Sequence, residues 1–265
     1  MAVVVVAAIW QLVSWTEPSA AFTVIERFTP NLVWRVKTEK PLVALSFDDG
    51  PDPEFTPEVL AILAQHGAKA TFFVIGERAA RHPDLIRRIR AEGHEVGNHY
   101  FIDGATLRHS DADFLGYLDR TERAAGIAGP VKLFRPPGGV AWPRQLDLAR
   151  ARGYTVVLGS AYPHDPAHPP MWYIRWLVEK NLGPGAIVIL HDGIRDPSRG
   201  IRALPDILLA GRQRGLQFVP IGVLLASGSQ ALRTGTGVQP LAREASSRYN
   251  IRRGNRRLQS RRSLR

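Results

Sequence analysis

From residue 41 onward, short apolar runs alternate with longer stretches in which apolar residues recur every three or four positions. The run at 42–47 predicts a strand. Thr56 as N-cap and Pro57 in the first turn predict a helix that ends near Gly67. Further strands are predicted at 69–75, 94–97, 132–134, 154–158, 186–190 and 216–219, and further helices at 77–92, 111–125, 144–152, 171–181, 201–214 and 221–226.

This alternation of about seven strands with helices is typical of an α/β protein with a parallel sheet. The body at 41–226 has 186 residues, whereas an eight-fold β/α barrel usually needs about 250. The pattern therefore predicts a short or incomplete barrel, with a doubly wound open sheet as the competing fold. The stretch at 22–40 is expected to be a connector.

The segment at 1–21 differs from the body, because no charged side chain lies between Met1 and Thr16. Its apolar run is shorter than the roughly 20 residues of a membrane-spanning helix, and it lacks the positive charge that usually begins a secretory signal. We interpret it as a signal-like segment or a truncated membrane anchor, with a buried first helix as the alternative. We expect a protein that is exported, in the cell envelope or membrane-anchored; a cytoplasmic location stays open.

The formal charge of +11 is concentrated at the other end of the chain. Residues 241–265 hold nine arginines and one acidic residue, so the rest of the chain carries only +3. We predict a disordered basic tail at 227–265, which could contact anionic lipid or polymer, and we expect no specific nucleic-acid partner. The absence of cysteine excludes a disulfide scaffold, a thiolate metal site and a cysteine nucleophile.

Polar residues follow the predicted strands, at the edge of a parallel sheet where active sites form. Two adjacent carboxylates could divide the work of metal ligand and base, and a His and a carboxylate four residues apart on a helical turn would face one side and could ligate zinc. In chain order these candidates are Asp48 and Asp49, His99 and Asp103, Arg135, His164 and Asp165, and His191.

Together these strand ends resemble the motifs of the polysaccharide deacetylase family, the NodB-homology domain of carbohydrate esterases. The first motif, Ser or Thr followed by Phe-Asp-Asp-Gly-Pro, is matched at 46–51, Arg-x-Pro at 135–137 and Leu-x-His at 189–191. The resemblance covers 41–226 and implies a distorted seven-fold β/α barrel. It also implies hydrolysis of acetyl groups on N-acetylated glycans such as chitin oligomers, peptidoglycan or exopolysaccharide.

The resemblance also implies a role for each matched residue. Asp48 would be the general base, oriented by Arg135, and His191 the general acid, oriented by Asp165. The substrate and its oxyanion would meet Pro137, the backbone N–H of Gly138, and Leu190. A divalent metal, zinc first and manganese, cobalt or nickel as alternatives, would be bound by Asp49, His99 and Asp103.

Two motifs depart from the family pattern. Asp103 stands where the second metal-binding His is usual, so His109 or His164 are alternative third ligands. The fourth motif of the family, Asp-x-x-Asp-Trp, keeps only Asp165 and lacks its Trp, which Trp172 or Tyr162 could replace. An O-acetyl esterase acting on xylan-type polymer, and a non-catalytic glycan-binding envelope protein, are therefore kept as alternative functions.

Overall fold

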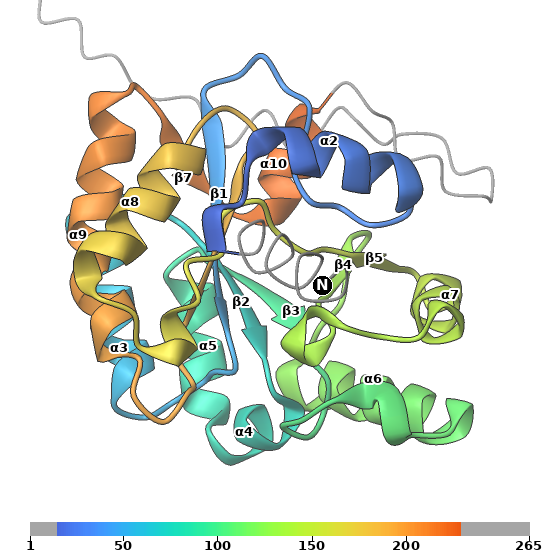
Figure 1. The fold of residues 1–265 in the computed structure, drawn as a ribbon. Coiled ribbons are helices and arrows are strands. Elements are labelled where there is room, and N and C mark those ends of the chain that lie inside the picture. Colours follow the sequence, from blue (N-terminus) through green and yellow to red (C-terminus); the bar gives the residue numbers. More distant parts are fainter. Residues whose placement is uncertain (1–14, 229–265) are drawn as a thin grey trace, which may run out of the picture. The chain divides into compact units, whose positions relative to one another are not determined.

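Seven parallel strands form the centre of the protein, whose residues 15–228 are described by a computed structural model (Figure 1). The strands are β1 (Leu42–Asp48), β2 (Thr71–Val74), β3 (Glu95–Asn98), β4 (Lys132–Phe134), β5 (Tyr154–Val156), β6 (Ile187–His191) and β7 (Gln217–Val219). Their order is β5-β4-β3-β2-β1-β6, and β7 pairs with β1. Residues directly after β5 bond to β6, since Ala161 forms a parallel bridge with Val188, and this contact joins the two ends of the sheet.

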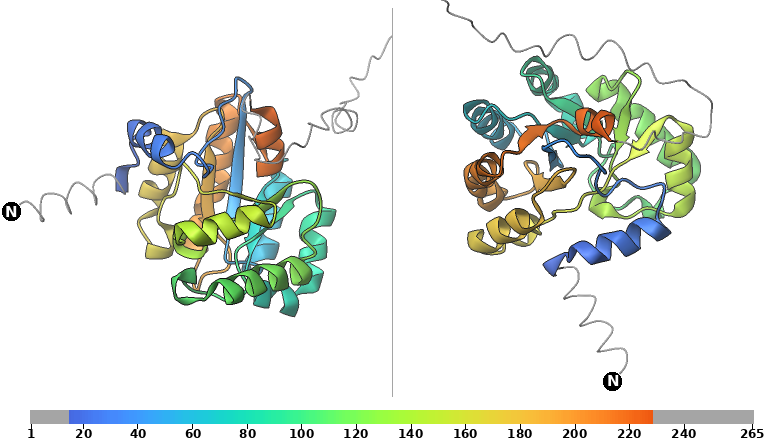
Figure 2. Two further views of the ribbon diagram at one scale, coloured as in Figure 1. Left: turned by 90° about the vertical axis from the view of Figure 1, so that its right-hand side faces the viewer. Right: turned by 90° about the horizontal axis from the view of Figure 1, so that it is seen from above.

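Helices surround the strands, as the view from above shows (Figure 2, right). The α-helices are α2 (Ser19–Phe28), α3 (Phe55–Gln65), α4 (Gly76–Arg81), α5 (Pro83–Ala91), α6 (Asp111–Ala125), α7 (Pro143–Ala151), α8 (Met171–Asn181), α9 (Ser198–Gln213) and α10 (Ile221–Ser227). Three short 3₁₀ turns follow β3, β4 and β5 at Thr106–Arg108, Pro137–Gly139 and Asp165–Ala167. The predicted seven-fold β/α barrel is confirmed.

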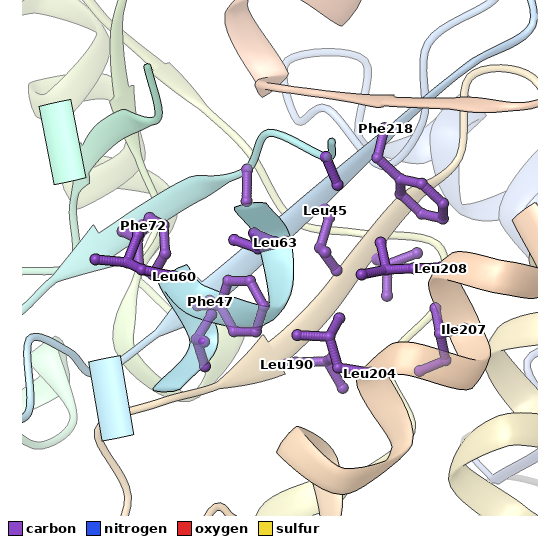
Figure 3. Packing of buried hydrophobic residues seen from close by; sticks show 14 of the residues in the cluster. Leu45, Phe47, Leu60, Leu63, Phe72, Leu190, Leu204, Ile207, Leu208 and Phe218 are labelled. Carbon is purple, nitrogen blue, oxygen red and sulfur yellow. The ribbon is translucent and has the colours of Figure 1, made fainter. Parts of the chain in front are cut away.

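The main hydrophobic core lies between the strands and the helices α3 and α9 (Figure 3). β1 is buried along almost its whole length, as expected for a strand covered on both faces. Phe47 stacks on Phe72 of β2 with ring centres 5.2 Å apart. Leu190 and Leu204 pack in the same cluster from β6 and α9. This packing fixes the strands whose carboxyl ends carry the site.

The stretch at 22–40, expected to be a connector, begins as helix: it holds most of α2. α2 is drawn dark blue in Figure 2. Its polar side is tied to the chain that follows, because Arg35 Nε donates to Glu26 Oε1 at 2.8 Å and Arg35 Nη2 to Thr23 Oγ1 at 3.0 Å. The stretch therefore contains a helix, and beyond it Val33 forms a parallel bridge with Val157.

Residues 1–14 of the predicted signal-like segment and 229–265 of the predicted tail lie outside the described residues. Within 15–228, no helix has both the length and the apolar character needed to cross a membrane.

Candidate active site

Asp48 ends β1, and a buried arginine fixes its carboxylate. Arg135 Nη1 donates to Asp48 Oδ1 at 2.6 Å and to Ser46 Oγ at 2.8 Å. Its Nη2 donates to the backbone oxygen of Leu158 at 2.9 Å, and the guanidinium lies 4.1 Å from the centre of the Phe73 ring. Because Arg135 is only 2% exposed and held on several sides, it gives the carboxylate one orientation, as a general base requires.

His99 follows β3 and faces both aspartates. Its Nδ1–H donates to the backbone oxygen of Arg135 at 2.8 Å, so Nε2 points to the carboxylates, 3.2 Å from Asp49 Oδ1 and 4.0 Å from Asp48 Oδ2. Burial favours the neutral form of Asp49, but the hydrogen bond and charge of His99 outweigh it and lower the pKa of Asp49 to about 2. Burial likewise opposes the charge on His99, yet Asp48 and Asp49 raise its pKa.

His191 ends β6 and lies beside Asp48, because the two residues are partners in the register of β1 and β6. Its ring Nδ1–H donates to Asp165 Oδ1 at 2.9 Å, and its backbone N–H donates to Asp165 Oδ2 at 3.0 Å. Burial disfavours the imidazolium, but the Asp165 carboxylate outweighs burial and raises the pKa of His191 to about 9. At neutral pH, His191 is therefore a cation whose Nε2–H is left for the substrate.

These side chains open into one pocket of about 700 Å³. Its floor is made by Asp48, Asp49, His99, Arg135 and His191. Its walls are apolar and aromatic for the most part, with a rim of glycines near Gly138. A pocket that combines a few convergent ionisable groups with an apolar wall is the usual form of a small-molecule or substrate site.

The structure corrects one predicted substrate residue. Leu190 packs in the core behind the sheet (Figure 3), and Ile189 lines the pocket instead. The reason is strand geometry: neighbouring side chains point to opposite faces, so Ile189 and His191 share a face that Leu190 cannot reach. Pro137 and Gly138 do line the pocket. Gly138 has φ of 65°, a left-handed conformation that glycine adopts without strain.

Asp103 lines the same pocket as Asp49 and His99, but its carboxylate faces Arg78. The helical turn expected over 99–103 does not form; the first helical turn after β3 is at Thr106–Arg108. The Asp103 side chain is 65% exposed, and its Oδ2 lies 3.3 Å from Arg78 Nη2, although the residue still lines the rim of the pocket. Within 15–228, no three His or carboxylate side chains gather in a metal-binding arrangement.

The donors present fit a divalent metal in two of the three predicted positions. Asp49 and His99 offer a carboxylate oxygen and an imidazole nitrogen, which are suitable ligands for zinc. His99 also donates its other ring N–H to a backbone carbonyl, the outer contact that typically orients a metal-binding histidine. The third position is not filled by any predicted residue in this structure.

Of the alternative residues named for the two motifs that differ from the family pattern, some line the pocket and others do not. His109 bonds to the Tyr100 hydroxyl, 3.1 Å from its Nδ1, and does not line the pocket. Trp172 is 69% exposed and also lies outside the pocket lining. Tyr162 and His164 do line the pocket, and the Tyr162 ring centre lies 5.9 Å from that of His191.

The N-terminal segment also contributes to the pocket, which no motif in the sequence predicted. The pocket is also lined by residues of α2 and its entry, and by one residue after it: Glu17, Ala21, Phe22, Ile25 and Trp34. The spacing of Ala21, Phe22 and Ile25 was the available signal, because these positions share one side of a helix.

The protein thus places two buried pairs, Asp48–Arg135 and His191–Asp165, at the carboxyl ends of parallel strands, where the active sites of β/α barrels form. Comparisons with known proteins identify its family. Residues 35–157 match the family model described as polysaccharide deacetylase.

A peptidoglycan-N-acetylglucosamine deacetylase of Bacillus cereus is 38% identical over 203 residues, 74% of this chain and 94% of that protein. A chitooligosaccharide deacetylase of Sinorhizobium fredii is 41% identical over 168 residues, 60% of this chain and 75% of that protein. The crystal structure of Bc1960, a peptidoglycan N-acetylglucosamine deacetylase in complex with an aromatic hydroxamate, has a TM-score of 0.69 and 30% identity, covering 76% of this chain and 95% of that one.

The chain belongs to the polysaccharide deacetylase family. It is an enzyme of carbohydrate esterase family 4, a hydrolase that acts on amides.

Proposed function

We propose that the protein removes the acetyl group from N-acetylglucosamine units of a glycan, in peptidoglycan or in chitooligosaccharides. One observation carries this proposal. Asp48 and His191 are register partners at the ends of β1 and β6, each fixed by its own buried partner, and both open into the same pocket. A base and an acid side by side are what amide hydrolysis needs, because water must lose a proton and the amine must gain one.

In this proposal Asp48 accepts the proton of the attacking water, and Arg135 keeps the carboxylate turned toward it. The backbone N–H of Gly138 donates to the developing oxyanion. His191, kept cationic by Asp165, donates its Nε2 proton to the leaving amine. Acetate and a free amino sugar are the products.

A divalent metal, zinc first, would be held by Asp49 and His99, with Asp103 as the third ligand if its side chain turns from Arg78. When bound, such a metal supplies Lewis-acid polarisation of the acetyl carbonyl and lowers the pKa of a bound water.

The direct test is acetate release from an N-acetylglucosamine tetramer and from peptidoglycan, with zinc, manganese, cobalt and nickel supplied in turn. We expect release with at least one metal, and loss of turnover in Asp48→Asn with metal binding retained. Release from acetylated xylan alone would support the O-acetyl esterase, and glycan binding without acetate release under any metal would support the non-catalytic protein.

The third ligand has its own test. If Asp103 ligates the metal, Asp103→Ala lowers zinc affinity at least about tenfold in a calorimetric titration. Asp113→Ala, which removes a carboxylate at the start of α6, is the control. An unchanged affinity in Asp103→Ala would leave Asp49 and His99 as the protein ligands.

We also propose that the protein is exported or anchored at the cell envelope, which the uncharged apolar stretch before Glu17 supports. Cell fractionation tests this location. The arginines of 241–265 are proposed to hold the protein on anionic lipid or polymer. Deleting them should leave activity on soluble oligomers unchanged and lower binding to anionic vesicles.

A further inference from the structure

The N-terminal segment from Glu17 to Trp34 builds one wall of the active-site pocket, although the family match begins only at residue 35. Five residues of this segment line the same pocket as Asp48 and His191. The segment therefore places side chains within reach of whatever extends from the reacting group.

Trp34 is the largest of these side chains, and its position is fixed. The preceding residue, Val33, is bonded to the end of β5 and to the chain after it. The Val33 N–H donates to Val156 O at 3.0 Å, and the Leu158 N–H donates to Val33 O at 2.7 Å. The indole Nε1–H donates to Thr29 Oγ1 at 2.9 Å. The ring is half-buried and therefore presents a rigid aromatic surface to the pocket.

Phe22 of α2 supports this ring from behind. It is buried, and its ring centre lies 6.0 Å from that of Trp34. The Thr29 hydroxyl that accepts from the indole is itself fixed, because it donates to Ile25 O at 2.7 Å. Trp34 is thus pre-organised for stacking, so little conformational entropy is lost when a flat ligand meets it.

The same end of the chain also contacts the loop after β5, whose residues Tyr162 and His164 line the pocket. The Glu17 carboxylate accepts the backbone N–H of Tyr162 at 3.0 and 3.1 Å. The Trp15 ring stacks on His164 with centres 4.6 Å apart, and the Trp15 carbonyl accepts from the Tyr173 hydroxyl at 2.7 Å. An aromatic surface thus lies in one pocket with a carboxylate, a phenol and an imidazole.

This combination matches the two chemical sides of a pyranose ring, whose C–H face packs on an aromatic ring while its hydroxyls bond to polar side chains. We propose that Trp34, with Glu17, Tyr162 and His164, forms a subsite for the sugar unit next to the one that is deacetylated. The inference rests on the proposed function and names the part of the glycan that the N-terminal segment recognises.

A longer N-acyl chain is the competing occupant of an apolar wall. It would need no polar groups, and covering the Glu17 carboxylate and the Tyr162 hydroxyl with a hydrocarbon chain would cost the free energy of removing polar groups from water. The mixed lining of the wall therefore favours a sugar.

The test compares acetate release from single N-acetylglucosamine and from its tetramer by the full-length protein and by Trp34→Ala. We expect the KM for the tetramer to rise roughly five- to thirty-fold, the range for removing an aromatic anchor. The kcat should change little, and the constants for the single sugar should stay within about twofold, because the single sugar does not reach Trp34. Trp172→Ala, which removes an exposed tryptophan of α8 outside the pocket, is the matched control.

Trp34→Phe separates stacking from folding, since it keeps an aromatic ring; we expect it to recover most of the tetramer affinity with an unchanged melting temperature. Equal losses for the single sugar and the tetramer in Trp34→Ala would overturn the subsite. So would a loss confined to glucosamine carrying an N-hexanoyl group, because this result assigns the wall to an acyl chain.

Failure of the proposed function has a different signature. If the unmodified protein releases no acetate from either substrate, calorimetric binding of the tetramer still decides the inference. Weaker binding by Trp34→Ala than by Trp172→Ala supports the subsite, and equal binding refutes it.

Discussion

Asp165 touches His191 twice, once at the ring and once at the backbone. The ring contact sets the tautomer and the charge, and the backbone contact fixes the strand end that carries the ring. Arg135 likewise fixes the Asp48 carboxylate, since its other donors are bound to the Ser46 hydroxyl and to the backbone oxygens of Val157 and Leu158. At this scale the site consists of two reactive groups, each with a buried partner that leaves it one orientation.

Replacing Asp165 by Asn should remove the main cause of the raised pKa of His191. The pKa is expected to fall from about 9 toward its ordinary value of roughly 6.5. Because protonated His191 is the acid, activity is present below the folded pKa and is lost as the pH rises through it. At pH 8 we expect kcat to fall about thirtyfold, and at pH 6 only slightly.

The measurement is kcat against pH from 6 to 10. Asp196→Asn, at an exposed aspartate 3.8 Å from His168, is the control and should leave the profile in place. An alkaline limb that does not move in Asp165→Asn would show that Asp165 does not set the charge of the acid.

The residues of the strand ends could be predicted because their neighbours in the sequence identify them. Asp48 and His191 each follow an apolar run directly and Asp49 is the next residue after Asp48, so chain position alone places them at the edge of the sheet. Leu190 was assigned wrongly because it directly precedes His191 in the motif. The two-residue period of a strand puts its side chain on the opposite face from His191. Asp103 depends on a loop after β3, whose path no local pattern determines.

Among the secondary-structure elements, β1 and β6 contribute most to the geometry of the site, because their register puts Asp48 beside His191. The turns after both strands pack closely on each other. A Cβ on Gly193 would lie 2.1 Å from the backbone carbon and oxygen of Asp49. Only glycine lets the turn after β6 approach the turn that carries Asp49 so closely.

Gly193→Ala is therefore expected to separate the two turns. We predict a loss of about 2–3 kcal/mol in the free energy of unfolding, measured by denaturant titration, together with strongly reduced turnover. Gly116→Ala in α6 is the matched control: nothing lies within 4 Å of a Cβ added there, so the helix should gain about 0.5–1 kcal/mol. Equal stability of Gly193→Ala and the unmodified protein would contradict the close packing of the turns.

The helix α2 was missed because its signal is short. It has 10 residues and follows a longer apolar stretch, which drew the interpretation toward targeting. Most of the remaining helices and strands were close to their predicted ranges, since tertiary packing and local pattern agree there. Two details were wrong. The helix predicted over 77–92 is divided into α4 and α5 at Pro83, and the N-cap of α3 is Glu54 instead of Thr56. α9 begins at Ser198, earlier than the predicted 201, because the apolar pattern that marks a helix weakens in its first turn.

In the molecule as a whole, a buried histidine that affects the stability of the fold lies at the opposite edge of the sheet from the site. His94 precedes β3 and is buried; its Nδ1 accepts the backbone N–H of Ala70 at 3.1 Å. Its Nε2 has no hydrogen-bond partner among the described residues. Burial, and then the charge of Lys69, lower the pKa of His94 to about 4.

This depressed pKa predicts acid sensitivity of the fold. The neutral His94 contributes stability above its unfolded pKa of roughly 6.5, and this stability is lost as the pH falls toward the folded value of about 4. We expect a loss of about 2 kcal/mol between pH 7 and pH 4 from this group, measured by urea unfolding. His94→Asn, which keeps an acceptor for the Ala70 N–H, should flatten this part of the profile; an unchanged slope would assign the sensitivity to other groups.

The N-terminal wall has a practical consequence for anyone who prepares this enzyme. A protein whose N-terminus is trimmed to the start of the matched family region would begin at residue 35, and it would lack Glu17, Phe22 and Trp34. Its catalytic groups would remain, so a small chromogenic ester could still report activity. Rate constants and inhibitor rankings measured on such a fragment would describe a wider pocket than the one that residues 15–228 build.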